Sequence, residues 1–112
     1  MVIDVYSRYY CAECVFNEIP RKGALVKLTS DSAAGNIRYT VSVTFFPYRD
    51  PEDFVISYDA CAEKEIYNAR GRRSKKREKA FMEGFEAEID GLAASMGGRV
   101  LWDAPIRDAV TA

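Results

Sequence analysis

The sequence predicts an α+β fold, in which an antiparallel β-meander of four to five strands packs against one long C-terminal amphipathic helix. Two stretches carry this prediction. Between residues 37 and 47 every second residue is apolar, which is typical of a strand with one buried face. Between residues 75 and 96 large apolar residues recur at steps of three or four, which is typical of an amphipathic helix. The length of 112 residues suits a single domain spanning residues 1–112.

Runs of β-branched and aromatic residues, separated by turn signals, define the strands. Strands are expected at residues 2–8, 24–29, 37–47, 54–58 and 99–102. Residues 20–23, which read Pro-Arg-Lys-Gly, and residues 30–36, which contain Ser, Asp, Gly and Asn, are expected to form turns. The sheet is therefore expected to be a meander in which neighbours along the chain pair with each other.

Two helices are expected in the second half of the chain. Residues 60–69 are rich in good helix formers and follow Asp59, a residue suited to cap a short helix. The long helix begins after Ser74 and ends at Gly97. Its core-facing stripe consists of Phe81, Phe85, Ile89, Leu92 and Met96. A second stripe is small enough to let the helix approach the sheet closely, and consists of Ala80, Gly84, Ala87, Gly91 and Ala94.

The composition excludes several classes of function. The chain has no histidine, so it lacks the commonest general base and the commonest metal ligand. It also lacks a glycine-rich phosphate loop and a Gly-x-Ser-x-Gly nucleophile elbow, and we expect that it is not an enzyme. No apolar stretch is long enough to span a membrane and no signal peptide is evident, so the sequence predicts a cytoplasmic protein.

The strongest anomaly is a basic run over residues 70–79. It holds seven of the 16 basic residues and one of the 17 acidic residues, so the other 102 residues carry nine basic and 16 acidic side chains. The candidate partner-binding residues are Arg70, Arg72, Arg73, Lys75, Lys76, Arg77 and Lys79. Because these cations precede the acidic half of the predicted helix, they oppose the helix macrodipole. Helix stability alone does not explain that order.

Three interpretations of the run are open. It is a solvated helix start whose charges are balanced by pairs such as Lys79 with Glu83, or an electrostatic site for nucleic acid, or a site for an acidic protein surface. Seven tyrosines offer possible anchors or base-stacking platforms, although tyrosines are also ordinary at the margins of a sheet.

The three cysteines are an odd number, which suits a reducing compartment better than a disulfide framework. Cys11 and Cys14 form a Cys-x-x-Cys pair, and Cys61 stands at the expected start of the short helix. Over roughly residues 9–69 the chain resembles the treble-clef class of zinc modules. The resemblance rests on the order of a Cys-x-x-Cys turn, a hairpin and an expected helix that begins with a cysteine. The resemblance implies Cys11, Cys14 and Cys61 as zinc ligands. The chain lacks the second full cysteine pair that such modules have. The alternatives are small half-buried side chains or redox chemistry, and no cofactor is the leading expectation.

These observations together predict a small non-catalytic interaction protein that docks to a macromolecular partner, a protein or a protein–nucleic-acid complex, and blocks or bridges it. In size and architecture the chain resembles phage-encoded anti-CRISPR proteins, which implies an inhibitor of a nucleic-acid-binding machine. The alternatives are a DNA- or RNA-binding module that uses residues 70–79, and a degenerate zinc module.

Overall fold

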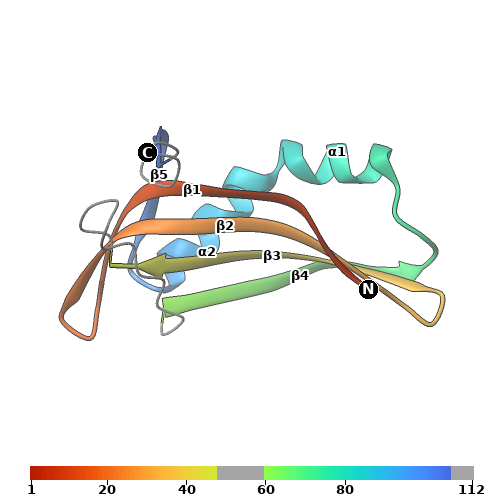
Figure 1. The fold of residues 1–112 in the computed structure, drawn as a ribbon, viewed down its shortest axis with the longest axis horizontal. Coiled ribbons are helices and arrows are strands. Elements are labelled where there is room, and N and C mark those ends of the chain that lie inside the picture. The colour runs from red at the N-terminus through yellow and green to blue at the C-terminus, as the bar shows by residue number, and fades with distance from the viewer. Residues whose placement is uncertain (48–59, 107–112) are drawn as a thin grey trace.

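The computed structural model shows a twisted five-stranded sheet with two short helices packed on one face, and it describes residues 1–47 and 60–106 (Figure 1). The strands are β1 (Val2–Phe16), β2 (Ile19–Ala33), β3 (Asn36–Phe46), β4 (Cys61–Arg70) and β5 (Arg99–Pro105). The helices are α1 (Lys75–Glu83) and α2 (Phe85–Ser95), and they lie between β4 and β5 in the chain.

All strand pairs are antiparallel, and the strands lie in the order β4-β3-β2-β1-β5. The first four strands are consecutive neighbours. The helices then carry the chain across the sheet, so that β5 pairs with β1. The strand predicted at 99–102 is confirmed within β5, and the strand predicted at 37–47 corresponds to β3. The strand predicted at 54–58 lies outside the described residues.

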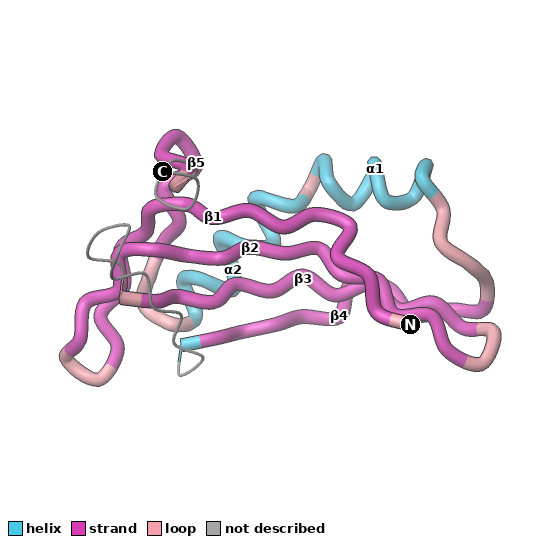
Figure 2. The backbone as a smooth tube through the Cα atoms, in the orientation of Figure 1, coloured by secondary structure: helices cyan, strands magenta, loops and turns pink. Residues whose placement is uncertain are grey.

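Two-residue turns join the long strands at opposite ends of the sheet (Figure 2). Asn17 and Glu18 have φ angles of 49° and 63°, and Ala34 and Gly35 have φ angles of 54° and 80°. Left-handed conformations at both central residues match the twist of the flanking strands. The turn predicted at residues 20–23 is therefore wrong, because these residues lie inside β2. Pro20 is tolerated there because it pairs only with Val15, before the pairing with β3 begins at Gly23.

The core lies between the helices and one face of the sheet. β3 contributes the largest share, because alternate residues point inward and are fully buried: Ile37, Tyr39, Val41, Val43 and Phe45. Ala24, Val26 and Leu28 of β2 lie on the same face. The helical layer adds Phe85, Ile89 and Ala93 from α2.

The predicted long helix packed on the sheet is wrong. Gly84, with φ −103° and ψ 5°, ends α1 and precedes α2, so the segment forms two short helices that run in different directions (Figure 1). The small residues predicted to contact the sheet are exposed along the helices. An added Cβ atom at Gly84 or Gly91 would meet no atom within 4 Å. Close approach to the sheet is therefore not the role of this stripe.

The predicted short helix over residues 60–69 is also wrong, because this segment forms β4. Ala62 and Lys64 lie opposite Val43 and Val41 of β3, while Glu63 lies opposite Ser42 on the other face. β3 needs a partner for its backbone groups on this side, and this tertiary pairing outweighs the helix propensity of an Ala-Glu-Lys segment. The fold is thus an antiparallel sheet with two short helices, and not a sheet covered by one long helix.

Within the described part of the chain, neither helix is long and apolar enough to cross a membrane.

Candidate functional site

The basic run begins where β4 ends and continues into the first two turns of α1. Gly71 has a φ of 133°, which a residue with a Cβ atom rarely adopts, and it lets the chain leave the sheet. Ser74 has extended backbone angles and caps α1, because its hydroxyl accepts a hydrogen bond from the Arg77 N–H at 3.3 Å. The run therefore forms one continuous corner of the molecule, at the end of the sheet opposite the β1–β2 turn (Figure 1).

Two of the seven candidate cations are held by other side chains. The Arg73 guanidinium donates two hydrogen bonds to Glu78, at 2.9 and 3.1 Å. The Arg77 guanidinium lies 4.5 Å from the centre of the Tyr67 ring. Both residues therefore fix the start of α1 on the sheet, and their use in partner binding stays a prediction.

Glu78 anchors α1 through a buried polar contact that the sequence analysis missed. The residue is only 7% exposed, and its carboxylate accepts a hydrogen bond from the Tyr39 hydroxyl at 2.7 Å. The Ser74 N–H donates to the same hydroxyl at 3.3 Å. The hydrogen bonds from Arg73 hold the pKa of the Glu78 carboxyl below its usual range, whereas burial and the bond to Glu78 raise the pKa of Tyr39. A charged Glu78 therefore fixes the orientation in which α1 presents its cations.

The other five cations form what we call the basic patch: Arg70, Arg72, Lys75, Lys76 and Lys79. All five side chains are exposed, and no ion pair of theirs is found within residues 1–47 and 60–106. The pairing predicted between Lys79 and Glu83 is not among the ion pairs of that part of the structure. Lys75 and Lys76 lie in the first turn of α1, where the free N–H groups already make the potential positive. The patch therefore attracts anions, and its charges repel one another.

The three cysteines do not come together. Cys14 is buried in the core, where burial raises the pKa of its thiol, and its Sγ atom lies 3.8 Å from the Met96 carbonyl oxygen. Cys11 is half-buried, and the register between β1 and β2 shifts between Cys11 and Cys14. Cys61 is exposed at the start of β4, three strands away from β1, and accepts a hydrogen bond from Thr44 at 3.2 Å.

The treble-clef resemblance therefore does not extend to the geometry of the candidate ligands. It requires a helix at Cys61, where the chain forms a strand. Among the residues that the structure describes, no group of three or more His, Cys, Asp or Glu side chains is placed to hold a metal ion. The cysteines do not fit a zinc ion as a set.

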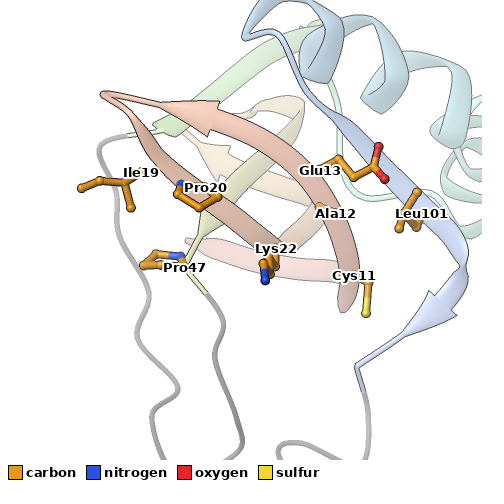
Figure 3. A pocket seen from close by; sticks show the side chains of 8 residues that line it. All are labelled: Cys11, Ala12, Glu13, Ile19, Pro20, Lys22, Pro47 and Leu101. Carbon is orange, nitrogen blue, oxygen red and sulfur yellow. The ribbon is translucent and has the colours of Figure 1, made fainter.

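A groove of about 840 Å³ lies at the other end of the molecule, beside the β1–β2 turn (Figure 3). Its wall is mainly apolar, with Ile19 and Leu101 among its lining residues, and Cys11, Glu13 and Lys22 add polar groups. Glu13 is engaged by Arg99 at 2.8 Å, and this hydrogen bond lowers the pKa of the Glu13 carboxyl. Because its described lining is mainly apolar, the groove suits contact with an apolar surface.

The β1–β2 turn next to this groove is another feature that the sequence analysis missed. Val15 and Ile19 are 67% and 50% exposed. Arg21 is buried and donates hydrogen bonds to the carbonyl oxygens of Phe16 and Ile19, at 2.6 and 2.9 Å. These bonds fix the turn, which therefore presents two apolar side chains on a rigid arm.

The tyrosines of the described core are mostly structural. Tyr39, Tyr67 and Phe81 form one group of ring contacts between the sheet and α1. The hydroxyls of Tyr6 and Tyr10 lie 3.0 Å apart, and burial together with this bond raises the pKa of Tyr10 to about 12. These rings support the fold and do not form an exposed stacking platform.

No family model, curated protein or solved structure matches this chain.

Proposed function

We propose that this chain is a small non-catalytic interaction protein that acts in the cytoplasm and docks through the basic patch onto an acidic surface of a protein partner. The observation that carries the proposal is the set of five exposed cations at one corner, for which the described residues supply no ion-pair partner. Docking there blocks the partner surface or bridges it to another molecule.

The placement of the cations supports binding more than folding. Lys75 and Lys76 stand in the first helical turn, where positive charge costs about 0.3–1 kcal/mol. Helices usually carry acidic residues at this position. An anionic partner that covers the patch would interact favourably with these lysines and offset their cost to the helix.

The charge of the whole chain favours a protein partner. The formal net charge is −1, because 16 acidic residues outside the run outweigh nine basic ones. A long phosphate backbone would meet this acidic remainder as it left the patch, whereas a protein partner needs to cover only the corner itself. The exposed apolar side chains Val15 and Ile19 lie at the opposite end of the sheet and offer a separate contact for the bridging form of the proposal.

Direct binding of DNA or RNA is the second candidate, and one observation favours it. The patch combines three lysines and two arginines with the free N–H groups of the first turn of α1, and this combination suits phosphate. In that case the affinity falls steeply with salt concentration.

The narrower form of the leading proposal is an inhibitor of a nucleic-acid-binding machine, of the anti-CRISPR kind. It rests on the small size of the chain and on the basic patch. Its test is the identity of the partner that the chain captures.

The first experiment compares capture from lysate by the wild type with capture by an Arg72→Glu and Lys76→Glu double variant, each with and without nuclease. Arg73 is left unchanged, because its replacement would release Glu78 and disturb the fold. The matched control reverses two cations outside both the patch and the groove, Arg8→Glu and Lys27→Glu.

A partner that survives nuclease and is lost only with the patch variant supports docking to a protein. A partner that disappears with nuclease supports the nucleic-acid alternative, which a salt titration against a labelled oligonucleotide then quantifies. Equal capture by the wild type and the patch variant would contradict both candidates.

A further inference from the structure

β4 carries opposite charges along one face of an open sheet edge. Glu63 and Glu65 stand in its first half and Arg70 ends it, and the three residues lie opposite Ser42, Thr40 and Asn36 of β3. Those positions of β3 are all even-numbered, so the three charged residues share the face of the sheet away from the helices. The strand therefore has an acidic half and a basic end on the same face.

A β-bulge produces this arrangement. The register passes from Thr40 with Glu65 to Tyr39 with Tyr67, which leaves Ile66 without a partner in β3. In a regular strand, odd-numbered Glu65 and even-numbered Arg70 would point to opposite faces. The additional residue brings them to one face, and Arg38 and Asn68 also contact Glu65 there, at 3.8 and 3.2 Å.

The outer edge of β4 is accessible to another strand. β4 is the last strand of the sheet on its side, and no described element lies along its outer edge (Figure 1). A groove of about 490 Å³ separates it from the junction of α1 and α2. Ala80, Gly84 and Ala87 line that groove and are exposed, and Phe81 also lines it. Glu88 crosses the groove and pairs with Lys64 of β4 at 2.9 Å, on the face of the sheet that carries the helices, so the contact leaves the backbone edge of β4 open.

We propose that β4 pairs antiparallel with β4 of a second copy of this chain, joining two five-stranded sheets into one. In the register that places Glu63 opposite Arg70 of the second copy, Glu65 lies opposite Asn68 and Lys64 lies opposite Ala69. Two-fold symmetry makes each of these pairs occur twice. Opposite charges that face each other across strands stabilise the pairing, and no like charges face each other in this register.

The uncovered first part of β1 does not have this property. β5 covers β1 only near residues 10–13, which leaves the outer edge of the first part of β1 free among the described residues. Asp4 lies opposite Thr29 and Arg8 opposite Val26, so these two charges point to opposite faces and cannot pair across a two-fold axis. Asp4 is also bound to Lys27 at 3.5 Å. Self-complementary charge therefore distinguishes β4 from β1.

Sedimentation velocity over a range of protein concentrations tests the proposal with the full chain. The wild type is expected to dimerise as its concentration rises. Arg70→Glu or Glu63→Arg alone places like charges opposite each other twice per dimer, and each is expected to weaken the dimer about tenfold. The double variant Glu63→Arg with Arg70→Glu restores opposite charges and is expected to recover most of the affinity.

The control is Lys22→Glu, which makes the same change of charge at an exposed position outside β4 and outside the basic patch, and should leave the dimer unchanged. Amide hydrogen exchange adds a second readout, because dimerisation through this edge increases protection in β4 with concentration. A chain that stays monomeric throughout, or a dimer that is insensitive to both single variants, overturns the proposal. Arg70 also belongs to the basic patch, but the test contains no partner and Glu63 lies outside the patch, so the response to Glu63→Arg distinguishes the dimer from the proposed docking.

Discussion

The two helices are bound to the same sheet by different chemistry. α2 buries apolar side chains, and Phe85 and Ile89 are 2% and 0% exposed. The one buried residue of α1 carries a carboxylate, Glu78, which is held by Tyr39 and Arg73. α2 therefore belongs to the core, whereas α1 is attached through a polar anchor together with the partly buried ring of Phe81.

This difference separates stability from binding along one short segment. Apolar burial is non-directional and tolerates small shifts, whereas a buried ionic hydrogen-bond network fixes one geometry. α1 carries three of the five cations of the basic patch, so its polar anchor sets the direction in which they point. α2 thus maintains the fold, and α1 holds its cations in a fixed direction at the surface.

The largest expected effect follows from removing the main side chain of α2. Phe85→Ala deletes a ring that packs edge-on against Tyr6 and Trp102, at centroid distances of 5.2 and 6.2 Å. We expect the free energy of unfolding to fall by about 3–5 kcal/mol. Urea unfolding measures this free energy. The control is Glu86→Ala at the exposed neighbouring position, which should change the free energy of unfolding by no more than about 0.5 kcal/mol.

Removal of the anchor charge in α1 has a smaller effect. Glu78→Gln weakens the bonds to Tyr39 and Arg73 and is expected to lower the free energy of unfolding by about 2 kcal/mol. Amide exchange should rise in α1 and stay unchanged in α2. An equal loss of protection in both helices would show that α1 is not attached separately. Glu83→Gln, at an exposed position of the same helix, is the control.

The same anchor predicts a pH dependence. Hydrogen bonding to Arg73 lowers the pKa of Glu78 in the folded state. The contribution of Glu78 to the free energy of unfolding is therefore fully present above the ordinary carboxyl pKa of 4.5. It is lost as the pH falls through the lower pKa of the folded state. Wild-type stability should therefore fall more than that of Glu78→Gln between pH 6 and pH 3. Parallel curves for the two proteins would mean that Glu78 is not charged when buried.

The cap of α1 gives the next smaller effect. Ser74→Ala removes the acceptor for the Arg77 N–H and is expected to cost about 1 kcal/mol. Ser74→Asp keeps the acceptor and adds a favourable charge at the helix start, so it should match or exceed the wild type. Thermal unfolding of the two variants measures the difference, and equal losses in both would contradict the capping role.

The sequence predicted those parts of the fold that local pattern determines. Alternation at Tyr39, Val41 and Val43 identified β3, because a strand with one buried face leaves that signature. β4 was missed, since its helix-forming composition is outweighed by pairing with β3, which no local window contains. The Asn17-Glu18 turn was missed for a related reason: it contains no glycine, although both residues adopt left-handed conformations.

The sequence locates the basic run but not the organisation of its side chains, and partner binding there stays a prediction. The basic run is visible as a cluster of charge in the sequence. Arg73 is held by Glu78, which is bound to Tyr39, and Arg77 is held by the ring of Tyr67. The register of β3 with β4 brings these two tyrosines together. Sequence spacing alone therefore does not separate the cations that hold the fold from those that remain exposed.

The central claim is that the first cations of α1 serve binding at a cost to the helix, and the unfolding free energy of a Lys75→Glu and Lys76→Glu double variant tests it most directly. Acidic residues in the first turn interact favourably with the helix dipole, so the variant should gain about 0.3–1 kcal/mol per position over the wild type while losing capture of the partner. A variant that is less stable than the wild type would show that these lysines support the fold, and would contradict the claim.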